Sequence, residues 1–546
     1  MSRRHWTRSY GSIPFEIDAD RHPSMNALLG NAMRQFAAKP AFHAFGTTLT
    51  YEDVDRLSYA FAAFLQQTAG VKAGDRVAVM LPNLLAFPIA TIAIWRIGGI
   101  VVNVNPLYTA RELEHQLNDA GVESIVVCTA SAAKTLAAVI DTTQVKTVVT
   151  VSQGDCGGIG PIPSDQDRAI LRDAVSLSTA IARGESFQCD PVYVSSNDLL
   201  LLQYTGGTTG VSKGAALSHR NVLANIEQFK AFMSGALDPG SEVVVTAIPL
   251  YHIFALAVNF LTYFSIGAEN WLVANPRNAE QLFDVLEAAR PTVLTGVNTL
   301  YAALTSHPRM STTDWSRLKL SAGGGAAVMN VVSERWRAAT GKFIREGYGL
   351  SETSPVISFN PQFIAEFTAT TGMPVPSTDV KLLDDAGNEV GIGECGEVCV
   401  KGPQVTGGYW NAPEANATAF TPDGYFRTGD IGVFDGRGFL KIVDRKKDMI
   451  IVSGFNVYPN EVEAVAAEFA GVAECACIGV PDSKTGEAVE LFVVKRAQAD
   501  VSEAALIEHC RRVLAAYKTP KTIRFVDALP KSTVGKILRR ELQCMK

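Results

Sequence analysis

The sequence contains few cysteines, and none of them form a recognisable metal-binding pair. Nine cysteines are spread over 546 residues, an odd number without a CxxC spacing. Neither a zinc site nor a regular disulfide framework is therefore expected. Cys475 and Cys477 alternate with apolar residues, as on a strand, so we expect both to pack as small hydrophobic side chains. This cysteine usage is typical of a protein in a reducing cytoplasm.

The sequence also lacks an excess of basic residues. It has 49 Lys and Arg against 55 Asp and Glu, a net charge of -6, which argues against a dedicated nucleic-acid binder with a strongly basic surface. Hydrophobic residues make up 47% of the chain, too many for a disordered protein. Since one domain typically has about 100–200 residues, we expect a large folded body with at least one smaller domain.

One long run, residues 243–268, contains no Asp, Glu, Lys or Arg and is long enough to cross a bilayer. Pro249, His252 and Asn259 interrupt it, and it begins with the strand-like VVVTAI. We therefore expect a strand, a turn and a buried helix there. The first ten residues, MSRRHWTRSY, are basic but lead into no apolar segment, so a secretory signal is not expected.

Strand-like and helical segments alternate along most of the chain. Runs rich in β-branched residues occur at 77–80, 125–127, 145–151, 243–248 and 292–295. Helical patterns between them occur at 57–67, 86–97, 110–120 and 279–289. Strands separated by helices of this length predict parallel βαβ units and an α/β fold.

The pattern changes twice towards the C terminus. From about residue 372, short strands are expected at 380–383, 397–400 and 439–442, between turns such as DDAGNE and FDGRGF, which indicates a β-rich subdomain. After residues 444–447 a smaller α+β pattern begins. Its expected elements are a helix at 459–469, strands at 474–480 and 489–495, and a helix at 502–515.

The first segment that carries chemistry is QYTGGTTGVSKG at 203–214, after an apolar run. Glycines let backbone N–H groups approach phosphate oxygens, the threonines supply hydroxyls and Lys213 supplies charge. We expect this phosphate cradle on a connection from a strand to a helix, with Ser218 as the helix N-cap. The spacing does not match a Walker A motif, which weakens the alternative of a P-loop phosphotransferase.

This string and six later ones resemble the motifs of the acyl-adenylate-forming superfamily, which includes acyl-CoA synthetases, luciferases and the adenylation domains of peptide synthetases. In order they are TGGTTGVSKG at 205–214, PLYHIF at 249–254, SAGGGAAV at 321–328, EGYGLSET at 346–353, YFRTGD at 425–430, DRKKDMIIVSGFNVYPNEVE at 444–463 and PKSTVGKILRREL at 530–542. The segments LTGVNTLYAAL, GPQVTGGYW and IVDRKKDMI are similar to those of bacterial long-chain fatty acid–CoA ligases.

The resemblance implies a reaction in two steps. ATP and a carboxylic acid give an acyl-AMP and pyrophosphate, and the thiol of CoA then displaces AMP; Mg²⁺ is the implied metal. The first step brings two anions together, so a lysine is expected to dominate catalysis. At about 4 Å and an effective dielectric near 20, one lysine supplies roughly 4 kcal/mol of attraction.

The resemblance also implies roles for individual residues. It assigns catalytic roles to Lys536, His252 and Glu352. Lys536 would bridge the carboxylate and the phosphate. His252 would lie near the carboxylate and gate the acyl pocket. Glu352 and Thr205 would hold the metal. ATP and AMP would contact Thr205, Gly206, Gly207, Thr208, Thr209, Gly210, Lys213, Gly323, Gly324, Gly325, Gly347, Tyr348, Gly349, Thr353, Asp430 and Arg445.

Within that set, Tyr348 and the three glycines from Gly323 would shape the adenine pocket, and Asp430 would accept hydrogen bonds from the ribose hydroxyls. The acyl pocket would be formed by Tyr251, Ile253, Phe254 and Val297. Without the resemblance, Lys536 is simply a solvated cation in a basic tail, and His252 is a core histidine.

By the same resemblance the chain divides into an N-terminal AMP- and acyl-binding domain, residues 1–446, and a mobile C-terminal domain, residues 447–546. Lys447 matches the hinge, where a large change of backbone angles moves the smaller domain. Ser453, Gly454 and Phe455 match the strip that lines the CoA tunnel after that movement.

The absence of acidic residues from one segment restricts the class of substrate. No acidic residue lies between Glu242 and Glu269, so the ammonium of an amino acid would be buried unpaired at high cost. A long- or medium-chain fatty acid is the leading expectation. An aryl- or short-chain acyl-CoA ligase, an acyl-carrier-protein ligase and a non-catalytic acyl or nucleotide sensor remain alternatives.

The expected partners are small molecules: a fatty acid, ATP and CoA, with no nucleic acid. The expected location is the cytoplasm, with weak peripheral contact at the inner face of the membrane, because the basic C-terminal tail could meet anionic lipid. A homodimer stays open, since nothing in the sequence decides the oligomeric state.

Overall fold

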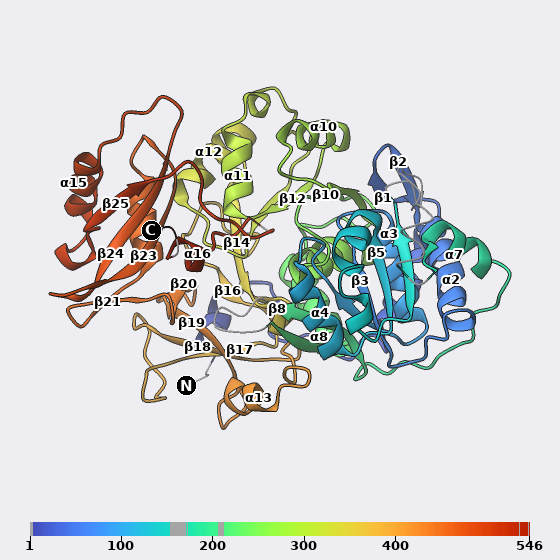
Figure 1. Cartoon of the computed structure of the whole chain (residues 1–546). Coiled ribbons are helices and arrows are strands. Elements are labelled where there is room, and N and C mark those ends of the chain that lie inside the picture. Colours follow the sequence, from blue (N-terminus) through green and yellow to red (C-terminus); the bar gives the residue numbers. More distant parts are fainter. Residues whose placement is uncertain are drawn as a thin grey trace.

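The structure is a computed structural model that describes residues 4–152, 171, 173–205, 212–533, 535–543 and 545. It has a large N-terminal part and a small C-terminal part, which lies at one end of the molecule (red in Figure 1). The α/β class, the β-rich subdomain and the smaller C-terminal domain predicted from the sequence are confirmed. Among the described residues, no helix is long and apolar enough to cross a membrane.

Two sheets form the large part. One has seven strands, in the order β7 (Val175–Ser176), β6 (Thr147–Val151), β5 (Ser124–Cys128), β3 (Arg76–Met80), β4 (Ile100–Asn103), β8 (Leu199–Thr205) and β9 (Lys213–Ser218). All neighbours are parallel except β8 and β9. The linking helices include α3 (Ala86–Arg96) and α4 (Ala110–Ala120), so the predicted βαβ units are present.

The second sheet has nine strands, in the order β16 (Met373–Pro374), β15 (Val356–Phe359), β14 (Ile344–Gly349), β13 (Leu320–Gly323), β12 (Val293–Gly296), β10 (Val243–Thr246), β11 (Glu269–Leu272), β1 (Pro40–Ala44) and β2 (Thr47–Thr50). Its centre is parallel, with helices α10 (Ala279–Ala289), α11 (Asn298–Thr305) and α12 (Asn330–Thr340) between strands. β15 turns back antiparallel to β14 and brings the chain towards the β-rich subdomain.

The β-rich subdomain is an antiparallel sheet of β17 (Asp379–Leu383), β18 (Gly396–Lys401), β19 (Phe426–Phe434) and β20 (Leu440–Arg445). The C-terminal part follows directly. Its sheet contains β21 (Ile450–Val452), β22 (Phe455–Val457), β23 (Val472–Asp482), β24 (Gly486–Lys495) and β25 (Thr522–Phe525), with helices α14 (Pro459–Ala467), α15 (Glu503–Val513) and α16 (Arg539–Leu542). Cys475 and Cys477 are both buried in β23, as predicted.

Two local predictions need correction. The glycine- and threonine-rich string does not connect a strand to a helix: it joins the antiparallel strands β8 and β9, and Lys213 is the first residue of β9. The sequence KGAALS has no β-branched residue, so its strand character comes from pairing with β8. Ser218, by contrast, is the N-cap of α8 (His219–Phe232), as predicted.

The apolar run at 243–268 also differs in its helix. After β10 the chain forms a π-helix, η4 (Ala255–Thr262), and then the short α9 (Tyr263–Ser265). Buried amides hold η4 against the sheet: the Asn259 Nδ2 group donates to the Thr295 hydroxyl at 2.8 Å, and Asn270 Nδ2 donates to the Asn259 carbonyl at 2.8 Å. π-helices are rare and occur mostly near functional sites.

Candidate active site

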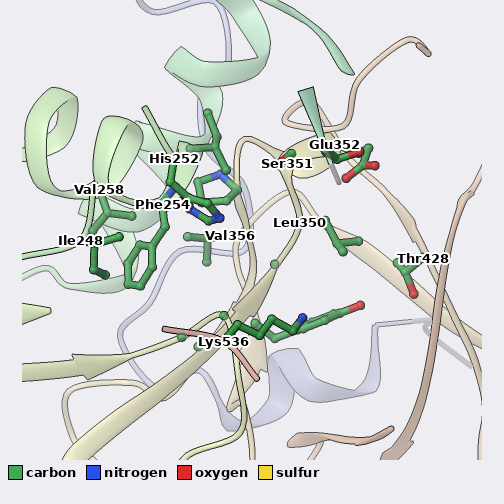
Figure 2. A pocket seen from close by; sticks show the side chains of 18 of the residues that line it. Ile248, His252, Phe254, Val258, Leu350, Ser351, Glu352, Val356, Thr428 and Lys536 are labelled. Carbon is green, nitrogen blue, oxygen red and sulfur yellow. Dashed lines mark hydrogen bonds between the residues drawn. The ribbon is translucent and has the colours of Figure 1, made fainter. Parts of the chain in front are cut away.

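A cavity of about 630 Å³ lies where the two sheets, the β-rich subdomain and the C-terminal part meet. Most of the predicted site residues line it, namely Thr205, Lys213, His252, Ile253, Phe254, Val297, Gly323, Gly324, Gly325, Gly347, Tyr348, Gly349, Glu352, Arg445 and Lys536. Its size is typical of a site for small molecules. Figure 2 shows apolar side chains, Ile248, Phe254, Val258 and Val356, on one side of the pocket and Glu352 and Thr428 on the other.

Glu352 forms part of the polar side. It is a buried residue of the 3-10 helix η6 (Ser351–Thr353), and the Tyr409 hydroxyl donates to its carboxylate at 2.7 Å. Burial raises the pKa of Glu352, because the charged form is costly in an apolar environment. The Lys213 ammonium lies 5.5 Å from the centre of the Tyr409 ring, so a cation and a carboxylate flank one tyrosine.

Asp430 lies directly behind the lining. It lies in the middle of β19, and the Tyr348 hydroxyl donates to one carboxylate oxygen at 2.7 Å. Arg445 Nε lies 3.2 Å from the other oxygen. Burial, followed by the negative charge of Asp430, raises the pKa of Tyr348 well above its usual value. These three side chains from β14, β19 and β20 form one polar wall.

Lys536 enters the cavity from the C-terminal part. Its loop is attached to the large part by a hydrogen bond of 2.9 Å from the Thr299 hydroxyl to the Gly535 carbonyl. Lys536 lines the cavity and is half-buried. Burial, with Arg445 nearby, lowers the pKa of Lys536 to about 8. It is therefore a partly desolvated cation near the polar wall.

His252 and Phe254 lie at the junction between the polar and apolar sides. Burial, reinforced by the charge of Lys536, lowers the pKa of His252 to about 4, so the ring is neutral near pH 7. The Phe254 ring lies against the backbone of Gly324, where an added Cβ would come within 3.2 Å of it. Glycine at this position allows the aromatic wall to approach the second sheet.

An ion-pair network joins the loop of Lys536 to both sides of the predicted hinge. Arg539 contacts Glu463 of the C-terminal part at 2.8 Å and Asp444 of β20 at 3.3 Å. The Asn460 backbone N–H donates to Asp444 at 2.8 Å. Lys447 lies in the turn between these groups and contacts Asp448 at 3.7 Å. Asp444 therefore holds the C-terminal part across the turn.

Several predicted residues lie away from the cavity. Tyr251 and Thr353 do not line it: Thr353 bonds to the backbone of its own turn, and Tyr251 contacts Thr533. The turn Ser453–Phe455 lies in the C-terminal part, where the exposed Phe455 ring stacks on Tyr517 with centroids 4.8 Å apart. The predicted phosphate contacts Gly206, Gly207, Thr208, Thr209 and Gly210 lie outside the described residues.

Sequence reasoning missed part of the lining. Phe229 of α8, Val258 of η4 and Phe359 of β15 line the apolar side. Tyr409 lies on the polar side, in the segment GPQVTGGYW, which carried the resemblance but received no role. The three apolar residues give no local signal, because they have the pattern of ordinary core side chains.

Comparison with known proteins supports the same arrangement. Residues 29–410 match the AMP-binding enzyme family, and residues 461–536 match the AMP-binding enzyme C-terminal domain. The long-chain-fatty-acid–CoA ligase of Salmonella typhimurium is 50% identical, over 99% of this chain and 98% of that protein. The protein of the same name from Bacillus subtilis is 38% identical, with 99% and 98% covered.

Solved structures give a matching fold. ATP-bound MatB from Rhodopseudomonas palustris superposes with a TM-score of 0.83 at 30% identity, over 96% of this chain and 99% of that one. The anthranilate CoA ligase AuaEII in complex with anthranoyl-AMP has a TM-score of 0.86 at 23% identity, over 98% of both chains, a likeness of fold. With both family regions matched in order and half the residues shared with full-length relatives, the chain belongs to the AMP-binding enzyme family, the acyl-adenylate-forming superfamily that its motifs resemble.

Proposed function

We propose that this protein activates a long- or medium-chain fatty acid with ATP and transfers the acyl group to CoA. The observation that carries the proposal is the position of Lys536, in a cavity whose walls are apolar on one side and polar on the other. The apolar side suits a hydrocarbon chain and the polar side a nucleotide. Full-length relatives named long-chain-fatty-acid–CoA ligase support the same substrate class.

In the first step a carboxylate oxygen attacks the α-phosphorus of ATP, and the bond from that phosphorus to pyrophosphate breaks. Lys536 neutralises the negative charge of both reactants as they approach. A cation already desolvated in the site does this without reorganising solvent, which makes electrostatic stabilisation effective. Asp430, supported by Tyr348 and Arg445, is proposed to accept hydrogen bonds from the ribose hydroxyls.

Glu352 and Thr205 are proposed to hold Mg²⁺. Glu352 presents a buried carboxylate that accepts a hydrogen bond from Tyr409, and Thr205 supplies a hydroxyl; both are hard oxygen ligands. Among the described residues no group of three or more His, Cys, Asp and Glu could hold a metal by itself, which suits an ion that takes most of its ligands from phosphates and water. When bound, Mg²⁺ would neutralise phosphate charge.

In the second step the CoA sulfur attacks the acyl carbonyl carbon and AMP leaves. Lys536 would have to withdraw first, so we propose that residues 447–546 rotate about Lys447 and bring Ser453, Gly454 and Phe455 to the cavity. The position of Phe455 is compatible with this role, because its ring is 56% exposed while one face stacks on Tyr517.

The test is a product analysis. Oleate, ATP and CoA should yield oleoyl-CoA, AMP and pyrophosphate, whereas a phosphotransferase would yield ADP. ATP–pyrophosphate exchange that depends on the fatty acid, without CoA, would identify the acyl-AMP intermediate. Turnover with benzoate or acetate but not oleate would instead favour an aryl- or short-chain ligase, and transfer only to a carrier-protein thiol would favour a carrier ligase.

Weak peripheral contact with anionic lipid, a cytoplasmic location and a homodimer stay predictions from the sequence. Cosedimentation with anionic vesicles and the mass of the protein in solution would test them.

A further inference from the structure

Two aromatic rings line the apolar side of the cavity. Phe229 on α8 and Phe359 on β15 both line the cavity, and both are almost fully buried, with exposed fractions of 3% and 4%. Their ring centroids lie 5.4 Å apart at an interplanar angle of 63°. An edge-to-face pair at this distance is a favourable aromatic contact.

Phe359 is fixed by its surroundings. Its ring lies against the backbone of β14, where a Cβ added to Gly347 would come within 2.7 Å of it. Phe359 also bonds through its backbone to both β14 and β16. Phe229, in contrast, reaches the cavity from a helix, so a shorter side chain there removes the barrier without disturbing the sheet.

More aromatic core lies behind this pair. Phe232, one turn further along α8, is fully buried and does not line the cavity. Its ring lies 6.5 Å from that of Phe359 and 6.0 Å from that of Tyr10. Packed aromatic side chains therefore lie behind this pair, so the room that a shorter side chain at position 229 opens is limited to the volume that it vacates.

We infer that Phe229 determines the length of acyl chain that the site accepts, by closing the apolar end of the cavity against Phe359. Val258, on the π-helix η4, forms another wall of the same recess, and Figure 2 places it beside Ile248 and Phe254. The inference rests on the proposed function, since it assigns the recess to a hydrocarbon chain. It goes beyond that function by naming the residues that limit the length of the acyl chain.

Substitutions on the two walls should act in opposite directions. Phe229→Leu shortens the barrier, so acids longer than the preferred one gain apolar contacts. Each methylene that enters this space should raise kcat/KM by about fourfold, the value of burying one CH₂ group. Val258→Met fills the recess and should shift the preference towards shorter acids by a similar factor.

The experiment measures kcat/KM for a series of saturated acids from octanoate to stearate, using AMP formation with CoA and saturating ATP. Phe232→Leu is the matched control, because it makes the same change on the same helix but outside the cavity. Its chain-length profile should equal that of the unmodified protein. Thermal unfolding of each variant checks that it is folded, and Val258→Met provides the test if Phe229→Leu does not fold.

Opposite shifts by Phe229→Leu and Val258→Met, with no shift by Phe232→Leu, would support the inference. Unchanged profiles in folded variants, or an equal shift by the control, would overturn it while leaving the proposed function intact. If the unmodified protein releases AMP with none of the acids, the proposed function fails, and the inference fails with it.

Discussion

The large N-terminal part and the small C-terminal part contribute to the cavity very unequally. The first supplies side chains from both sheets and from the β-rich subdomain, whereas Lys536 is the one described lining residue of the second. The walls belong to extensive buried clusters. The loop of Lys536 is held by a few polar contacts, from Thr299 and around Arg539.

This difference indicates a division of labour. A rigid wall suits binding, because its side chains are already positioned before substrate arrives. A cation on a separately attached loop suits a group that must be present in one step and absent in the next. Binding and chemistry should therefore respond to different substitutions, and four experiments test that separation.

The largest effect is expected from Lys536→Ala. Loss of the one cation supplied by the C-terminal part should lower acyl-AMP formation by about 10²–10⁴-fold, as for other single electrostatic donors. KM for ATP should change little, because the walls are intact. Fatty-acid-dependent ATP–pyrophosphate exchange measures both quantities. Lys531→Ala is the control: Lys531 pairs with Glu474 at 2.6 Å outside the cavity, and exchange near the unmodified rate is expected.

Lys447→Pro should separate the two steps. The Asp448 backbone N–H closes the turn around Lys447 by donating to the Arg445 carbonyl, and the Lys446 N–H donates to the Gly429 carbonyl of β19. Neither bond uses the Lys447 N–H, so proline leaves both in place. It removes the freedom of φ that a rotation requires. Thioester formation from acyl-AMP should fall by about 10²-fold, the cost of misplacing reacting groups, while exchange is retained. Lys447→Ala should preserve both steps, and equal loss of both steps by Lys447→Pro would count against domain rotation.

The pH dependence of adenylation should follow Lys536. A lysine is charged below its pKa, so the cation is present below pH 8 and is lost as the pH rises through its lowered pKa of about 8. The pH dependence of kcat/KM reports pKa values of the free enzyme. The value of kcat/KM should therefore fall about tenfold per pH unit above the pKa of Lys536. Lys536→Arg keeps its charge throughout this range. A high-pH decline of the same form in that variant would assign the titration to another group.

The smallest effect is expected from Asp444→Asn. This change removes the charge that faces Arg539 across the hinge but keeps the shape of the side chain. Because Glu463 still pairs with Arg539, adenylation should fall only by about threefold to tenfold, within the range for losing one ordinary hydrogen bond. Thioester formation from supplied acyl-AMP should not fall in parallel. A parallel fall in both rates would indicate general destabilisation rather than a weakened contact across the hinge.

Much of the polar lining was named in advance, but on different grounds. The composition of its loop pointed to Lys213, whereas Glu352, Arg445 and Lys536 were identified by the resemblance of their motifs to a known family. The apolar side of the site was less predictable from the sequence. Phe229, Val258 and Phe359 are apolar residues within ordinary helix and strand patterns, and hydrophobic periodicity does not distinguish a wall of a cavity from solid core.

Some elements of secondary structure were likewise predictable from the local sequence, and others were not. The parallel βαβ units followed from hydrophobic periodicity, and the start of α8 from the capping preference of Ser218. The strand β9 was missed because KGAALS has little intrinsic strand preference and is held by pairing with β8. The π-helix η4 was expected as an ordinary buried helix. Asn259 of this helix bonds to Thr295 of β12 and to Asn270 of β11, contacts that hydrophobic periodicity does not reveal.

Composition and periodicity were enough for the α/β class, the β-rich subdomain and the smaller C-terminal domain, because these depend on local preference. The meeting of Lys536 with His252 and the aromatic end formed by Phe229 and Phe359 arose only from tertiary packing. The reason is physical: closing a cavity and lowering the pKa of a lysine both require burial by groups far apart along the chain.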